Sequence, residues 1–253
     1  MQKIHATSDF NSWEPSPARL ELAGDEIHVW RASLEREQSM LNQLQTTLSA
    51  DEKARANSFF FQRDRNHFIA ARGILRDLLG KYVNRSPAHL EFDYGPQGKP
   101  ALRCALAERS VLFNVSHSDG VALFGFGIGR QLGVDVERVR KFAGETIAER
   151  YFSPQEVVEL RALPQASQDE GFFLCWTRKE AYIKARGEGL QLPLKSFHVS
   201  LTPGKPERLQ TADGVDWSLR SLRPEPQYVG ALVGEGKGWK LRGYSWTTSS
   251  VRG

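Results

Sequence analysis

Two acidic side chains, Asp135 and Glu137, stand two positions apart in the stretch GVDVE at residues 133–137. Residues two apart in an extended strand point to the same face, so the two carboxylates are predicted to lie side by side. Val134 and Val136 then point to the other face. Neighbouring carboxylates repel one another unless a cation lies between them, and oxygen ligands of this kind suit Mg²⁺. A strand with a water-exposed acidic face fits the same pattern equally well.

A second pair of charges, Glu180 and Lys184, lies in the stretch CWTRKEAYIKARGEGL at residues 175–190. This stretch is predicted to be a helix on which Trp176, Glu180 and Lys184 share one face. Taken alone, a Glu four residues before a Lys is most simply a surface ion pair, which stabilises a helix by about 0.2–0.5 kcal/mol. If the helix faces the acidic strand, Glu180 becomes a third carboxylate and Lys184 a cation for phosphates. That set fits a magnesium-bound pyrophosphate, with one carboxylate able to accept a proton from an attacking hydroxyl.

Two residues in turns could contact the same anion. Lys99 stands in the loop GPQGKP at residues 95–100, where backbone N–H groups and a cation can face a phosphate, although most such loops are plain turns. His117 stands in a tight turn between two expected strands and could donate to a phosphate. A lone histidine in a loop is more often a surface residue.

The elements that must position these side chains follow from hydrophobic periodicity and from the Gly and Pro residues that interrupt it. The first 24 residues are expected to be a poorly ordered lead-in, and residues 111–137 an antiparallel meander of three strands. Strands are predicted at 26–33, 90–94, 111–116, 121–128, 132–137, 197–201, 215–222, 227–233 and 239–246, and helices at 35–48, 51–83 with a break near 61–64, 154–163 and 168–186.

This order of elements predicts an α+β fold with two similar halves, each with helices packed on a small antiparallel sheet. The halves are expected at residues 1–130 and 131–253, and the second carries both charged motifs.

Composition limits the class of protein further. The 253 residues carry a net charge of +4, which suits a polyanionic ligand or an acidic partner, and no dense Lys/Arg run indicates nucleic acid. Only two cysteines are present, so a disulfide framework and a zinc site are not expected. No apolar run approaches the roughly 20 residues that span a bilayer, and no signal peptide is recognisable at the start. We therefore expect a cytoplasmic protein.

Four blocks in the sequence resemble the Sfp-type 4′-phosphopantetheinyl transferases, the longer, pseudo-dimeric class of that superfamily. GVDVE at 133–137 resembles the family's G-[IV]-D-[IV]-E block, and WTRKEAYIK at 176–184 resembles its W-x-x-K-E-x-x-x-K block. FNVSHS at 113–118 resembles its F-N-[IVL]-S-H-[ST] block, and GKP at 98–100 resembles the turn upstream of it. The blocks occur in the family's order, and the resemblance spans roughly residues 59–192.

The resemblance implies a fold, a reaction and a set of site residues. The protein is expected to be a monomer with a cleft for coenzyme A between its halves, and to move phosphopantetheine onto a serine of an acyl or peptidyl carrier protein with release of 3′,5′-ADP. The implied Mg²⁺ ligands are Asp135, Glu137 and Glu180. The implied catalytic residues are Glu180, as base for the serine, and Lys184, at the leaving pyrophosphate. The implied contacts to coenzyme A are Arg65, Lys99, Pro100, Ser116, His117 and Lys184.

Two other functions stay open on the residues alone. One is a Mg²⁺-dependent phosphohydrolase of nucleotides in which Glu180 activates water, although no phosphohydrolase signature accompanies the three acids. The other is a module that binds coenzyme A or a carrier protein without catalysis and whose acids are structural. An assay with Mg²⁺, coenzyme A and an apo carrier protein separates all three.

Overall fold

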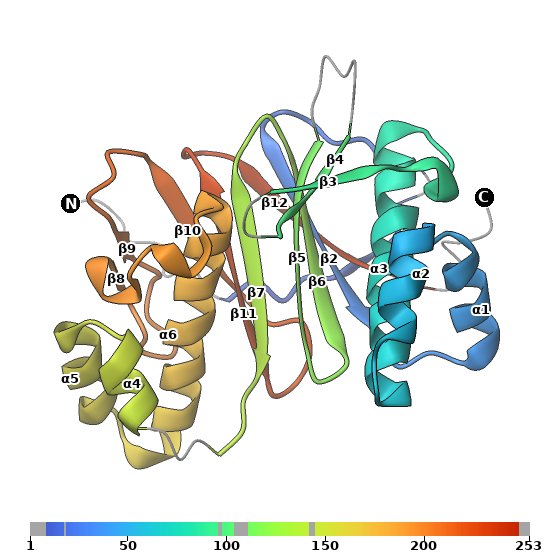
Figure 1. Ribbon diagram of the computed structural model, residues 1–253. Coiled ribbons are helices and arrows are strands. Elements are labelled where there is room, and N and C mark those ends of the chain that lie inside the picture. Colours follow the sequence, from blue (N-terminus) through green and yellow to red (C-terminus); the bar gives the residue numbers. More distant parts are fainter. Residues whose placement is uncertain (1–8, 18, 96–97, 104–110, 142–144, 248–253) are drawn as a thin grey trace.

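Two β-sheets stand next to each other in the middle of the molecule, with helices packed on the outer side of each (Figure 1). The computed structural model describes residues 9–17, 19–95, 98–103, 111–141 and 145–247. Each half packs helices against a sheet, which confirms the predicted α+β class. Within the described residues, no helix is long and apolar enough to cross a membrane.

The first half carries three helices on a five-stranded sheet of order β1-β12-β2-β6-β5. Its helices are α1 (Gln38–Thr46), α2 (Ala50–Asn57) and α3 (Gln62–Val83). Its strands are β1 (Glu14–Pro15), β12 (Lys240–Ser245), β2 (Glu26–Ser33), β6 (Val121–Ile128) and β5 (Val111–Ser118). A short hairpin of β3 (Phe92–Tyr94) and β4 (Pro100–Leu102) follows the 3₁₀ turn η1 (Pro87–His89).

In the second half, α6 packs on an antiparallel sheet of order β10-β11-β7, α5 packs against α6, and α4 packs against α5 (Figure 1). The strands of this half are β7 (Leu132–Arg138), β10 (Trp217–Leu222) and β11 (Tyr228–Glu235), and its helices are α4 (Glu145–Tyr151), α5 (Pro154–Ala162) and α6 (Gln165–Arg186). Smaller elements are η2 (Gly189–Gln191), η3 (Leu194–Ser196), β8 (His198–Val199) and β9 (Leu209–Gln210).

Local signals set the ends of the helices that carry the site. Ser153 and Glu156 form a capping box at the start of α5, as their spacing predicts. Helix α6 ends where Gly187 adopts a left-handed conformation (φ 70°), which glycine reaches without steric cost. It begins at Gln165, three residues earlier than the sequence predicts.

The expected meander of three strands is wrong at its third strand. β5 and β6 pair as an antiparallel hairpin, but β7 pairs with β11, with Asp135 opposite Ala231. The reason is that both edges of β6 are already taken, one by β5 and the other by β2. β7 therefore leaves the first sheet and begins the second.

The last strand, β12, belongs to the first sheet although it comes from the end of the chain. It runs parallel to β2 on one side and to β1 on the other, so the first sheet is not purely antiparallel. Residues 9–15 are docked and do not form the expected disordered lead-in, since Phe10 exchanges backbone hydrogen bonds with Ser221 and Arg223. Residues 1–8 and 18 of that lead-in lie outside the described residues.

Three apolar clusters form the core. One joins α1–α3 to the first sheet, one joins α6 to the second sheet, and the third lies between the two sheets. Val134 and Val136 belong to the third cluster and are almost fully buried, which confirms the face predicted for them. Burial of such a side chain contributes about 1.5–3 kcal/mol, so this cluster holds the two halves together.

Candidate active site

Strand β7 and helix α6 touch backbone to backbone at Gly133. A Cβ atom at this position would lie 2.1 Å from the Ala181 carbonyl oxygen and 2.4 Å from the Ala185 nitrogen. Only glycine allows this approach, because real side chains do not sit so close to backbone atoms. The contact brings the acidic face of β7 directly against the helix turn that carries Lys184.

Lys184 forms an ion pair with Asp135. Its Nζ lies 2.6 Å from Asp135 Oδ1 and also donates to Ser116 Oγ at 2.9 Å and to the Val134 carbonyl at 3.3 Å. The Asp135 side chain is 6% exposed and that of Lys184 is 28% exposed. The surface ion pair of Glu180 with Lys184 is therefore not the arrangement found, because the lysine reaches across to the strand.

Three polar side chains of β5 connect the two sheets beside this pair. Asn114, Ser116 and Ser118 alternate along β5 and so share one face. Asn114 Oδ1 accepts a hydrogen bond from the Val134 N–H at 2.9 Å. Ser116 Oγ donates to Asp135 Oδ1 and Ser118 Oγ donates to Glu137 Oε2, both at 2.7 Å. The sequence prediction assigns no role to Asn114 and Ser118. Their alternation with Ser116 along the strand could have indicated that all three face the acids.

The carboxylates of this site disfavour each other's charge. Burial, and then the negative charges of Asp135 and Glu137, raise the pKa of Glu180 to about 7. Burial also raises the pKa of Glu137, to which the charge of Asp135 adds, while the bond from Ser118 opposes the shift. The structure thus brings the three predicted acids within electrostatic reach of one another.

One oxygen of Asp135 has no partner. Its Oδ2 is buried and receives no hydrogen bond from the described residues. A buried carboxylate oxygen without a donor is costly, and a cation or a ligand proton would satisfy it. No three His, Cys, Asp or Glu side chains among the described residues already form a metal-binding group. Instead, Lys184 binds one oxygen of Asp135, and Ser118 binds one oxygen of Glu137.

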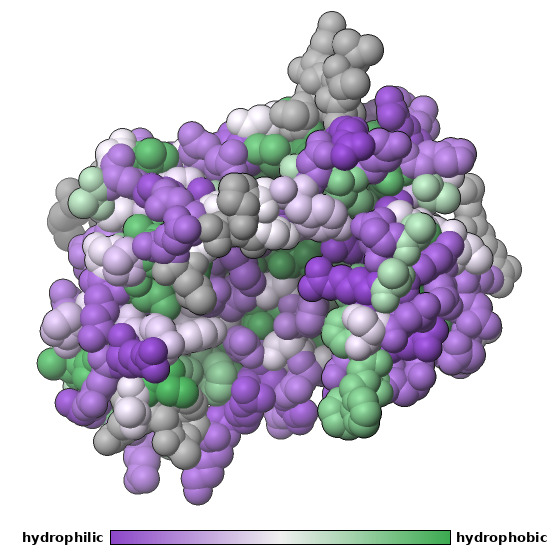
Figure 2. Space-filling model, viewed as in Figure 1, coloured by the Kyte–Doolittle hydropathy of each residue, from purple (hydrophilic) through white to green (hydrophobic). Residues whose placement is uncertain are grey.

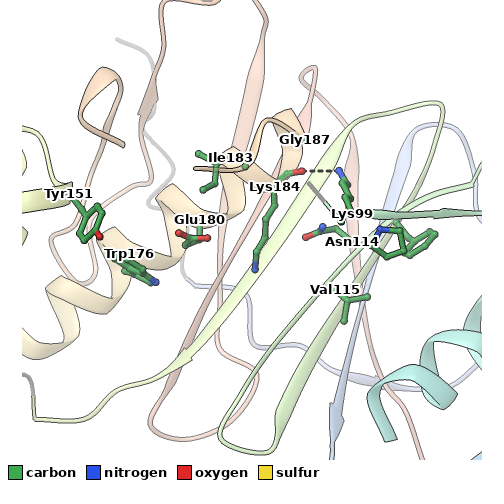
Figure 3. Close-up of a pocket in the computed structure, with 13 residues that line it drawn as sticks. Lys99, Asn114, Val115, Tyr151, Trp176, Glu180, Ile183, Lys184 and Gly187 are labelled. Atoms are coloured by element: carbon green, nitrogen blue, oxygen red, sulfur yellow. Dashed lines mark hydrogen bonds between the residues drawn. The ribbon is translucent and has the colours of Figure 1, made fainter. Parts of the chain in front are cut away.

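A cavity of about 460 Å³ opens beside these groups, between α6 and β5 (Figure 3). Figure 3 shows Tyr151 and Trp176 at one end, Lys99 and Asn114 at the other, and Glu180 and Lys184 between them. Tyr151 meets Trp176 edge to face at 5.8 Å. Tyr151 ends α4, a short helix that the sequence analysis missed.

Lys99 and Pro100 line the cavity as predicted, but Lys99 has a further contact. Its Nζ donates to the Lys184 carbonyl at 2.8 Å, near the C-terminal end of α6 (Figure 3). Burial lowers the pKa of this ammonium group. Pro96 and Gln97 of the predicted anion loop lie outside the described residues.

His117 and Arg65, the two other predicted contacts to coenzyme A, lie on β5 and α3. His117 lies near the end of β5 and keeps contact with solvent; desolvation and then the charges of Lys184 and His67 lower its pKa. Arg65 lies in the first turns of α3 and is not among the residues that line the cavity. His67, also on α3, is close enough to His117 for its charge to contribute to that lowering of the pKa, and it does not line the cavity either.

Two family models match the chain, one to each half. Residues 28–124 match the N-terminal model of 4′-phosphopantetheinyl transferases, and residues 131–233 match the 4′-phosphopantetheinyl transferase superfamily.

Two curated relatives carry the same description, and a solved structure is also similar to this chain. The 4′-phosphopantetheinyl transferase HetI of Nostoc sp. is 44% identical over 231 residues, which cover 91% of this chain and 96% of that protein. The 4′-phosphopantetheinyl transferase Sfp of Bacillus subtilis is 29% identical over 154 residues, covering 61% and 66%. A holo-(acyl-carrier-protein) synthase structure from Bacillus anthracis is 19% identical with a TM-score of 0.37, covering 42% of this chain and 94% of that one.

Extended similarity to HetI and the match of both halves to models of one family decide among the functions left open by the sequence. The chain belongs to the 4′-phosphopantetheinyl transferase superfamily and is a phosphopantetheinyl transferase.

Proposed function

We propose that this transferase moves the 4′-phosphopantetheine of coenzyme A onto a serine of an acyl or peptidyl carrier protein, that it depends on Mg²⁺, and that it releases 3′,5′-ADP. The observation that carries the proposal is the buried Asp135 Oδ2, which receives no hydrogen bond from the part of the chain that the structure describes and belongs to a group with two carboxylates whose pKa values are raised.

Asp135, Glu137 and Glu180 are the residues that would hold the metal. All three offer carboxylate oxygens, the ligands that Mg²⁺ prefers, and they carry unbalanced negative charge around one point of the fold. Bound there, Mg²⁺ would supply positive charge at the pyrophosphate of coenzyme A.

The reaction replaces the phosphoanhydride bond inside the pyrophosphate of coenzyme A by a phosphoester bond to the serine. The serine hydroxyl forms a bond to the phosphorus next to pantetheine, and the bond from this phosphorus to the bridging oxygen breaks. The serine proton goes to Glu180, directly or through water, because a carboxylate in this position can accept a proton from an attacking hydroxyl. The electron pair stays with the phosphate of the departing 3′,5′-ADP, where Lys184 offsets the new negative charge.

The remaining predicted residues are proposed to hold coenzyme A. Lys99 and Pro100 form one wall of the cavity, and Lys99 carries a charge suited to a phosphate. His117 and Ser116 are neighbours on β5. His117 is exposed to solvent, and Ser116 accepts a hydrogen bond from Lys184. Arg65 lies on α3, outside the cavity lining, so its contact would be with a part of coenzyme A that extends beyond it. We further propose that the protein acts as a monomer in the cytoplasm.

The test is a transfer assay with a defined apo carrier protein, coenzyme A and either Mg²⁺ or a chelator, followed by intact mass. The expected result is a carrier heavier by one phosphopantetheine, equimolar 3′,5′-ADP, and no product with the chelator. Transfer that persists without a divalent cation would refute the metal assignment. Breakdown of coenzyme A in the absence of a carrier would instead favour a hydrolase.

A further inference from the structure

Three consecutive aromatic residues, Phe59, Phe60 and Phe61, form an exposed patch between α2 and α3, which we call the aromatic patch. They are 37%, 92% and 63% exposed. Phe59 is held against Phe68 at 5.5 Å, while Phe60 and Phe61 meet edge to face at 5.0 Å. Figure 2 shows hydrophobic atoms gathered at the lower right, over the start of α3.

Phe61 does not help to stabilise the start of α3. Phe61 is the N-cap of α3 and provides no side-chain hydrogen bond to the first turn. Ser, Thr, Asp or Asn is preferred at an N-cap, so a phenylalanine at this position gives up a stabilising hydrogen bond. A large apolar residue that breaks a local rule and is not buried indicates contact with something outside the chain.

The start of α3, which carries part of the aromatic patch, borders the turn between β5 and β6. Two turns into α3, His67 Nε2 lies 2.9 Å from Glu35 Oε1, and Arg63 Nε lies 3.5 Å from the same oxygen. A Cβ atom at Gly120 would lie 3.4 Å from Glu35 and 3.7 Å from His67, so this end of α3 borders the turn between β5 and β6. That turn directly follows the strand that carries Ser116 and His117.

The charge around the aromatic patch is positive. Arg55, Arg63 and Arg65 flank it, against two acids, Asp64 in the same segment and Glu35, which pairs with Arg63. Both Arg55 and Arg63 are exposed. Two copies of this chain that met through identical patches would bring these arginines together, and like charges across an interface disfavour such a pair. An acidic partner with apolar side chains fits instead.

We propose that the aromatic patch is the docking surface for the carrier protein, which places Phe60 and Phe61 against apolar side chains of an acidic carrier surface while the acceptor serine enters the cleft. This proposal rests on the proposed function, because it assumes that a carrier is the acceptor. Exposed aromatic residues at the centre of an interface often dominate its affinity, and the surrounding arginines speed the encounter.

The test measures transfer kinetics for Phe60→Ala and Phe61→Ala, varying carrier and coenzyme A separately. We expect a rise of about tenfold or more in KM for the carrier, with KM for coenzyme A and kcat at saturating carrier changed less than twofold. Val215→Ala is the matched control, because Val215 is also an exposed apolar residue, 40% accessible, outside the patch, and its carrier KM should match the wild type. The KM for the carrier should also rise with salt in the wild type.

Three outcomes would overturn the proposal. The first is an unchanged carrier KM in both Phe variants while the wild type transfers normally. The second is a wild-type dimer that Phe60→Ala converts to a monomer with unchanged carrier KM, which would assign the patch to a second copy. The third is Phe60-dependent binding to anionic phosphatidylserine vesicles with unchanged carrier KM. Absence of transfer by the wild type on any carrier would instead refute the proposed function itself.

Discussion

The two oxygens of Asp135 have different roles. Oδ1 receives hydrogen bonds from Lys184 and Ser116, while Oδ2 is buried without a donor among the described residues. One oxygen thus fixes the position of the lysine, and the other leaves the carboxylate available to a cation. A bridging role of this kind links the proposed metal to the residue that would face the leaving group.

Glu180→Gln tests the proton acceptor at nearly constant shape. The amide cannot take the serine proton, so kcat should fall by about 10²–10⁴, the usual contribution of general base catalysis. The rate is measured under saturating coenzyme A and carrier. Glu149→Gln, an exposed residue of α4, is the control and should keep full activity. A fall in kcat below tenfold for Glu180→Gln would assign the proton to another acceptor.

The raised pKa of Glu180 also predicts how stability depends on pH without a divalent cation. In the unfolded chain the Glu180 carboxyl loses its proton near pH 4.5, whereas in the folded protein it keeps the proton up to about pH 7. The free energy of unfolding contributed by this group therefore falls as pH rises from about 4.5 to about 7 and is level above that.

Melting temperatures measured in a chelator between pH 5 and pH 8 would check this sign. Glu180→Gln should lose less stability over that range than the wild type, because it has no proton to release. Addition of Mg²⁺ at pH 8 should raise the melting temperature of the wild type and leave that of the variant nearer its starting value. Identical pH profiles for the two proteins would contradict the pKa shift.

At the scale of the elements, the site depends on how closely β7 approaches α6. Asp135 is on the strand and both Glu180 and Lys184 are on the helix, so their geometry is set by the contact at Gly133. If α6 moved away from β7 by the width of a methyl group, Lys184 would move away from Asp135, and Glu180 would move away from the two acids of the strand.

Gly133→Ala should therefore damage stability and activity at once. The added Cβ would meet the backbone of α6 at 2.1 Å, and overpacking of this kind costs about 1–3 kcal/mol. Chemical denaturation and kcat are the measurements. Gly24→Ala is the matched control, since no atom lies within 4 Å of its added Cβ, and it should be neutral in both. Wild-type kcat in Gly133→Ala would mean that the contact does not position the site.

Local sequence signals predicted the parts of the site that lie within single elements. The capping box at Ser153, the left-handed Gly187 and the alternation around Asp135 gave the right helices, strand and faces. The pairing of β7 with β11 was missed, because those strands are separated by about 90 residues and neither carries a local sign of its partner. Helical periodicity likewise left the register of α3 open, and the role expected for Arg65 stays a prediction.

At the scale of the whole molecule, the chain crosses between the halves more than once. Strands β1 and β12 lie in the first sheet, where β12 sits between β1 and β2, whereas Phe10 exchanges backbone hydrogen bonds with residues of the second half. Trp246, just after β12, donates from Nε1 to Asp77 of α3 at 2.8 Å. The division into residues 1–130 and 131–253 stays a prediction about similarity of the halves, and does not follow the hydrogen bonding of the sheet.

A fragment of residues 1–130 should consequently fail to fold alone. It lacks β12, so β2 would present an unpaired edge, and it loses the apolar cluster between the sheets. Circular dichroism and dye binding to exposed apolar surface are the measurements. The expected result is a partly folded, aggregating fragment that the separately expressed 131–253 piece rescues on mixing. A cooperative thermal transition for the fragment alone would contradict this dependence.

The place of β12 also sets an order of events during synthesis on the ribosome. β2 is made early, yet its parallel neighbour is the last strand of the described chain to be translated. Until Ser245 has emerged from the ribosome, the edge of β2 that pairs with β12 stays unpaired, and the first sheet is incomplete.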